Sequence, residues 1–202
     1  MILRLFTAFA LAMGLSMPLA VSMPGVASAE SGFAQFIRGG QPRVRHGRHA
    51  SDKSPIPRET VRSDLPANTI LVDTSERRLY FGLGNGKALK YGVGVGREGF
   101  TWQGRHSVTR KAEWPGWTPP KQMIAREARK GRKLPAYMEG GPNNPLGARA
   151  LYIGSTLYRI HGTNQPWTIG QAMSSGCIRM ANDDVIDLYN RVGVGTKVVV
   201  RH

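Results

Sequence analysis

Short β-branched and aromatic runs, each ended by glycine or proline, fill the chain from about residue 68 to the C-terminus. Runs of this length are typical of strands, and Gly84-Asn85-Gly86 has the composition of a hairpin turn. The strands expected are residues 69–73, 78–81, 87–95, 148–153, 157–160 and 197–200. The roughly 135 residues of this part suffice for one hydrophobic core, so a single domain over residues 68–202 is predicted.

Two segments of the same part are predicted to be helical. Residues 121–132 follow Pro120, a residue suited to the first turn of a helix, and they combine helix-forming residues with a strongly basic face. The second helix begins at residues 182–184, Asn-Asp-Asp, and Gly193 ends it. The predicted fold class is therefore α+β, mostly β, with a helical insert and a short helix near the C-terminus.

Residues 1–29 have the three consecutive regions of a secretory signal peptide: a basic start, an apolar stretch and a cleavage site. Arg4 precedes a largely apolar stretch over residues 5–23, and Ala27-Ser28-Ala29 is a small-x-small cleavage site. Gly14 and Pro18 interrupt the apolar stretch, so an uncleaved membrane anchor is the weaker alternative. We expect export to the periplasm or cell envelope, with no transmembrane segment after cleavage of the signal.

Residues 30–67 are predicted to be a flexible basic tether. They are rich in Gly, Pro, Ser, Arg and His, and they cannot bury enough apolar surface to offset the entropy of ordering. The tether either faces the cell wall or is a passive spacer. The whole chain has 28 Lys and Arg against 13 Asp and Glu, a formal net charge of +15, which favours an anionic partner. Among cell-wall polymer, anionic lipid and nucleic acid, export makes nucleic acid the weakest candidate.

Cys177 is the only cysteine of the chain, so it cannot form an internal disulfide. A thiol attacks as the thiolate, and histidine is the usual base because its pKa lies near neutral pH. His161 follows the strand expected over residues 157–160, so the intervening loop must fold back to bring Cys177 to it. Backbone N–H groups around Gly176 and Cys177 would hold the oxyanion of an acyl-transfer intermediate. These residues point to acyl transfer through a thioester.

The surrounding motif resembles that of the L,D-transpeptidase catalytic domain, also called the YkuD domain. The resemblance extends over roughly residues 68–201, and its most specific part is His161-Gly162-Thr163, Ile169-Gly170, residues 174–180 (Ser-Ser-Gly-Cys-Ile-Arg-Met) and Asn182. It implies a β-sandwich with Cys177 as nucleophile and His161 as general acid and base. The oxyanion or substrate-binding positions that it implies are Gly162, Thr163, Ser174, Ser175, Gly176 and Arg179.

Three details of this motif remain open in the sequence. Ser175 stands where many members of the family carry histidine. No Asp or Glu is an obvious partner for His161, so we expect a backbone carbonyl to hold one nitrogen of its ring. Arg179 either braces the loop or grips a carboxylate of the substrate.

The resemblance also implies a reaction. The donor would be a peptidoglycan tetrapeptide stem, and Cys177 would attack the carbonyl that precedes the terminal D-alanine. An amine of a second stem would give a 3→3 cross-link, an amine of an outer-membrane protein would anchor that protein, and water would make the chain a carboxypeptidase. No cofactor and no metal are expected, since the histidines are scattered.

Two other functions compete with this enzyme. One is a non-catalytic peptidoglycan-binding module of the same fold, and the other is a basic exported protein that binds nucleic acid or anionic lipid. A dinucleotide site is a further motif-level possibility, because residues 94–99 have the spacing G-x-G-x-x-G. Residues 100–104 do not look helical, so this segment is predicted to be a strand end and a turn.

Overall fold

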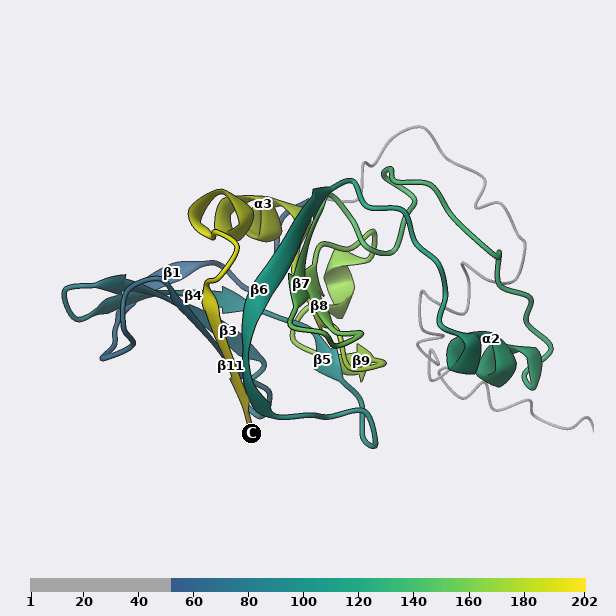
Figure 1. Ribbon diagram of the computed structural model, residues 1–202, viewed down its shortest axis with the longest axis horizontal. Coiled ribbons are helices and arrows are strands. Elements are labelled where there is room, and N and C mark those ends of the chain that lie inside the picture. Colours follow the sequence, from purple (N-terminus) through teal and green to yellow (C-terminus); the bar gives the residue numbers. More distant parts are fainter. Residues whose placement is uncertain (1–51) are drawn as a thin grey trace, which may run out of the picture.

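A nine-stranded sheet dominates the computed structural model, which describes residues 52–202 (Figure 1). The order of its strands is β1-β4-β3-β2-β11-β6-β7-β8-β10. Their bounds are β1 Glu59–Arg62, β2 Thr69–Asp73, β3 Arg78–Gly84, β4 Lys87–Gly92, β6 Gly104–Glu113, β7 Arg149–Ile153, β8 Arg159–His161, β10 Ile178–Arg179 and β11 Lys197–Arg201. A separate parallel pair consists of β5 (Val95–Gly96) and β9 (Ala172–Ser174).

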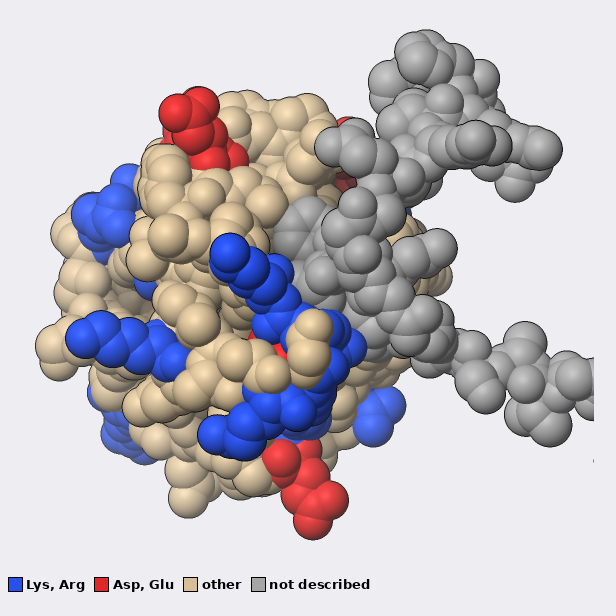
Figure 2. Space-filling model, turned by 90° about the vertical axis from the view of Figure 1, so that its right-hand side faces the viewer, with Lys and Arg blue, Asp and Glu red and all other residues tan. Residues whose placement is uncertain are grey.

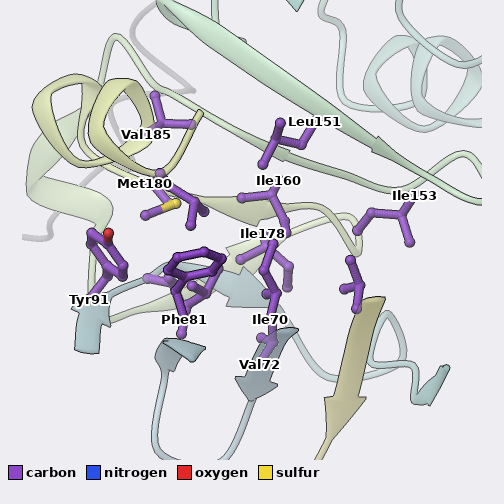
Figure 3. Close-up of a cluster of buried hydrophobic side chains, with 14 of the residues drawn as sticks. Ile70, Val72, Phe81, Tyr91, Leu151, Ile153, Ile160, Ile178, Met180 and Val185 are labelled. Carbon is purple, nitrogen blue, oxygen red and sulfur yellow. The ribbon is translucent and has the colours of Figure 1, made fainter. Parts of the chain in front are cut away.

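Strand β6 joins the two halves of the large sheet. Its first residues pair with β11 and its later residues pair with β7, and the register shifts between Val108 and Arg110. The halves enclose one hydrophobic cluster, in which Ile70 and Phe81 from β2 and β3 lie opposite Ile160 and Ile178 from β8 and β10 (Figure 3). Burial between two sheet faces is the packing of a β-sandwich.

Three helices complete the described part. They are α2 (Lys121–Ala128), the 3-10 helix η1 (Pro166–Thr168) and α3 (Asn182–Arg191). Val185 and Leu188 of α3 are fully buried in the cluster between the sheet halves. Helix α2 lies at the end of the molecule far from β1 (Figure 1). Its only residue classed as buried is Glu127, whose ion pairs lie within the insert. Met123, packed against Trp117 and Leu146, and Arg126, hydrogen-bonded to Ser175, connect α2 to the rest of the domain.

The predicted fold class is confirmed: the domain is mostly β, with a helical insert and a helix after Cys177. The predicted hairpin turn joins β3 to β4, and its three residues Gly84, Asn85 and Gly86 all have positive φ. The insert helix is shorter than expected, since it ends at Ala128 rather than near residue 132. Residues 94–99 form β5 and a turn, and no helix begins within residues 100–104, as predicted.

The predicted tether over residues 30–67 needs a correction in its second half. β1 pairs antiparallel with β4, from Glu59 opposite Lys90 to Arg62 opposite Lys87. Main-chain hydrogen bonds to the sheet edge hold this segment in place. The prediction of a flexible tether considered only apolar content and therefore missed these bonds. Residues 52–67 therefore belong to the domain, while the predicted signal over residues 1–29 and the remainder of the predicted tether lie outside the described residues. No helix within residues 52–202 is long and apolar enough to cross a bilayer.

Candidate active site

Parallel pairing of β8 and β10 brings the two predicted catalytic residues to one place. Ile178 lies opposite Ile160, and Arg179 lies opposite His161. Because side chains alternate along a strand, the isoleucines point into the core while His161 and Arg179 share the other face. Cys177 directly precedes β10 and lies on the same side, where its thiol borders the cleft that His161 and Arg179 also line.

This cleft has a volume of about 360 Å³. Of the residues predicted for the site, five line it: His161, Ser174, Ser175, Cys177 and Arg179. Its other walls come from the α2 insert, the loop before it and the β7–β8 turn, through residues such as Met123, Trp117 and Leu157. The chain thus forms an open groove around a half-buried thiol.

The imidazole of His161 is almost fully buried, with 4% of its surface exposed. Nδ1 donates a hydrogen bond to the carbonyl oxygen of Gly162 at 2.6 Å, which leaves Nε2 without a proton in the neutral ring. Burial, together with the positive charge of Arg179, lowers the pKa of His161 to about 3. The ring is therefore neutral at physiological pH and able to accept a proton, and the expected backbone carbonyl is the one of Gly162.

The lowered pKa of His161 predicts a specific dependence of stability on pH. The unfolded chain binds a proton at this ring below pH 6.5 while the folded chain does not, so the free energy of unfolding falls as pH decreases from 6.5 toward 3. The expected contribution is up to about 1.4 kcal/mol per pH unit. Asp184, whose pKa burial raises to about 6, opposes it between pH 6 and 3.8.

Urea unfolding of the parent and of His161→Gln across pH 4 to 7 separates the two contributions, because Asp184 is present in both proteins. The difference in unfolding free energy between parent and variant should shrink as pH falls. A difference that stays constant over this range would show that the ring of His161 titrates normally.

A tight turn holds the thiol in front of β10. The Ser174 hydroxyl donates to the carbonyl oxygen of Cys177 at 2.6 Å and accepts a hydrogen bond from the Gly176 N–H at 3.1 Å. Gly176 is buried and has φ of 106°, a conformation that side chains rarely adopt. Its N–H is engaged by Ser174, whereas no acceptor within residues 52–202 takes the N–H of Cys177.

Two aromatic residues support this turn from behind, and the motif gave no sign of that role. The rings of Trp102 and Tyr158 stack at 4.4 Å between centroids and 5° between planes. Trp102 Nε1 donates to the carbonyl oxygen of Gly176 at 2.7 Å, and a Cβ on Gly176 would lie 2.4 Å from Tyr158 Cε1. The stacked pair therefore fixes the backbone next to the thiol.

The remaining motif positions form the base of the site. Gly162 and Thr163 are buried and do not line the cleft. Asn182 Oδ1 accepts hydrogen bonds from the N–H groups of Thr163 at 3.2 Å and Ala148 at 3.0 Å. A Cβ on Gly162 would lie 2.3 Å from the same oxygen. The side chain of Asn182, expected at the start of α3, thus connects the residues after His161 to the residue that precedes β7, and it does not cap the helix.

Helix α2 reaches the site through a contact that the sequence did not indicate. Arg126 Nη2 donates to the hydroxyl of Ser175 at 3.2 Å, two residues before the thiol. The carboxylate of Glu127, 2% exposed, pairs with Arg126 at 3.3 Å and Arg132 at 2.9 Å. Ser175, one of the predicted substrate-binding residues, is therefore held by the insert. Among the described residues no cluster of His, Cys, Asp and Glu suits a metal ion.

Comparison with known proteins places this arrangement in a family. The family model described as "L,D-transpeptidase catalytic domain", YkuD, matches residues 67–200. The chain is similar to the "Probable L,D-transpeptidase ErfK/SrfK" of Escherichia coli (strain K12), with 39% identity over 150 residues that cover 72% of this chain and 47% of that protein. The chain spans about half the length of the curated relatives it matches first.

Two solved structures are also similar. "L,D-transpeptidase from Mycobacterium smegmatis" is 19% identical, covers 66% of this chain and 58% of its own, and has a TM-score of 0.49. A Brucella melitensis structure titled "Probable carnitine operon oxidoreductase caia" is 42% identical, covers 74% and 96%, and has a TM-score of 0.47. Because both scores are below 0.5, the assignment rests on the family model and the curated relatives. By these, the chain belongs to the YkuD family of L,D-transpeptidase catalytic domains.

Proposed function

We propose that this protein is an exported peptidoglycan L,D-transpeptidase that works through a thioester on Cys177. The observation that carries the proposal is the meeting of Cys177 with a neutral, buried His161 on one face of β8 and β10, in an open cleft. Membership of the YkuD family supplies the class of substrate. The predicted secretory signal over residues 1–29 supports action in the cell envelope.

The first half of the reaction forms the acyl-enzyme. His161 Nε2 takes the proton of the Cys177 thiol, and the thiolate attacks the carbonyl carbon that precedes the terminal D-alanine of a tetrapeptide stem. The nearby guanidinium of Arg179 attracts the thiolate. The N–H of Cys177 is the donor available to the oxyanion, since the N–H of Gly176 is held by Ser174. His161 then returns the proton to the nitrogen of D-alanine, which leaves.

The second half transfers the acyl group to an amine. The amine attacks the thioester carbonyl, His161 accepts its proton, and the Cys177 sulfur leaves as thiolate and is reprotonated. A second peptidoglycan stem as the amine yields a 3→3 cross-link, and an amine of an outer-membrane protein yields an anchored protein. Attack by water yields a tripeptide, which would be a carboxypeptidase side reaction.

Mass spectrometry of the products made from a purified disaccharide-tetrapeptide tests the proposal. We expect release of D-alanine together with a cross-linked dimer, and a tripeptide product where water competes. Tight binding of the tetrapeptide without release of D-alanine at any pH from 5 to 9 would contradict the proposal and identify a binding module instead.

A further inference from the structure

A second hollow, of about 260 Å³, adjoins the cleft that contains the thiol. Met123, Arg126, Ser175 and Arg179 line both, so the two form one continuous depression. The walls of the second hollow come from α2 and the turn that follows it, from β9 and from the segment after β5. We call this hollow the basic pocket, because five of its lining residues are cationic: Arg97, Arg126, Lys130, Arg132 and Arg179.

The positive charge of the basic pocket is only partly neutralised. Glu127 is its one acidic lining residue, and it pairs with Arg126, Lys130 and Arg132. Arg97 and Arg179 have no carboxylate within ion-pair distance among residues 52–202. Figure 2 shows Lys and Arg side chains gathered on the face of the molecule that α2 occupies. One carboxylate against five cations leaves an excess of positive charge at this place.

Packing holds these cations together despite their repulsion. The guanidinium of Arg97 lies 4.2 Å from the ring centroid of Phe100, and that of Arg126 lies 5.4 Å from the same ring. Burial and the neighbouring charge of Arg126 lower the pKa of Arg97. A bound anion would relieve this repulsion, and a guanidinium can donate two parallel hydrogen bonds to a carboxylate.

The basic pocket lies beside the thiol, and this position indicates which anionic group of a substrate would occupy it. Ser175 and Arg179 lie two residues on either side of Cys177 and line both hollows. A group in the basic pocket therefore lies next to a carbonyl placed at the thiol. A peptide donor that loses its last residue carries its terminal carboxylate one residue past the bond that breaks.

We propose that the basic pocket binds the C-terminal carboxylate of the leaving residue of the acyl donor, through Arg97 and Arg126 together with Arg179. The proposal rests on the function proposed above and adds to it a rule of specificity. The donor must end in a free carboxylate at the residue that leaves, so a C-terminal amide binds poorly. Ser175 keeps Arg126 turned toward this position through its hydroxyl.

Equilibrium binding in the Cys177→Ala background tests the pocket without the chemistry. Isothermal titration compares the tetrapeptide with its C-terminal amide. We expect the free acid to bind about 10- to 100-fold more tightly, the range of a charge-assisted hydrogen-bonded contact. Arg97→Gln and Arg126→Gln should each reduce this ratio to a few-fold, while Arg129→Gln should leave it unchanged. Arg129 is an exposed cation that directly follows α2 and lines neither hollow.

The outcomes separate this proposal from the proposed function. Equal affinity for acid and amide, or a ratio that persists in both Arg97→Gln and Arg126→Gln with unchanged melting temperatures, would overturn the carboxylate site. Turnover of both donors at the same rate by the parent protein would overturn it as well, and leave the transpeptidase function standing. A clear preference in binding with no release of D-alanine by the parent would support the site and contradict the function.

Discussion

Cys177→Ala should lower the turnover of a tetrapeptide donor by about 10⁴-fold or more, because the Ser174 and Ser175 hydroxyls, which also line the cleft, are already engaged in hydrogen bonds. The variant should fold normally. The thiol is half-buried, and its sulfur lies 4.0 Å from the carbonyl oxygen of Leu157, a weak contact. The measurement is release of D-alanine by the parent and the variant at equal concentrations, with thermal unfolding of both as the control.

Turnover within tenfold of the parent in this variant would exclude a covalent mechanism at Cys177. The same result would leave the family assignment intact, since that rests on similarity over residues 67–200. It would favour a reaction in which the cleft binds the donor and a water molecule attacks directly.

Gly176→Ala should lower both the stability of the domain and its turnover. Its φ of 106° costs a non-glycine residue roughly 1–3 kcal/mol. The new Cβ would also lie 2.4 Å from Tyr158 Cε1, and the stacked ring of Trp102 restricts how far Tyr158 can retreat. Overpacking adds roughly 1–3 kcal/mol, so we expect an unfolding free energy lower by about 3 kcal/mol. Displacement of the thiol should lower turnover by about 100-fold.

Gly195→Ala is the matched control for this prediction. Gly195 has φ of 92°, and nothing lies within 4 Å of a Cβ built on it. It should therefore show the backbone cost alone, about 1 kcal/mol, with unchanged turnover. Urea unfolding and D-alanine release measure both variants. Equal losses of stability in the two would show that the Trp102–Tyr158 pair does not confine the turn.

The strands, and the return of Cys177 to the cleft that His161 also lines, could be predicted from local sequence. Short apolar runs bounded by glycine identify strands because each run must bury one face. His161 ends such a run and Cys177 lies beyond a loop rich in turn residues, so a return of the chain was the simplest geometry. In the structure, the chain returns by parallel pairing of β10 with β8, which places Arg179 opposite His161.

The contacts that support the thiol could not be predicted in this way. Trp102 and Tyr158 are far apart in sequence, and only the closed sandwich brings their rings together. Glu127 looks in the sequence like any exposed glutamate of a basic helix, yet it is buried and pairs with Arg126 and Arg132 inside the insert. The contact of Arg126 with Ser175, which connects α2 to the turn before the thiol, has no local signal either. The edge strand β1 is held by main-chain hydrogen bonds to β4, and amino-acid composition does not predict such bonds.

Intact-mass spectrometry of the protein during turnover tests the central claim most directly. The purified protein is mixed with a tetrapeptide donor in the absence of an acceptor amine, and acid stops the reaction while the thioester is still present. We predict a mass increase equal to the donor minus its terminal D-alanine, located on the peptide that contains Cys177 and absent from Cys177→Ala. Release of D-alanine with an adduct on another residue, or with the thiol of Cys177 unmodified at every time point, would contradict the account.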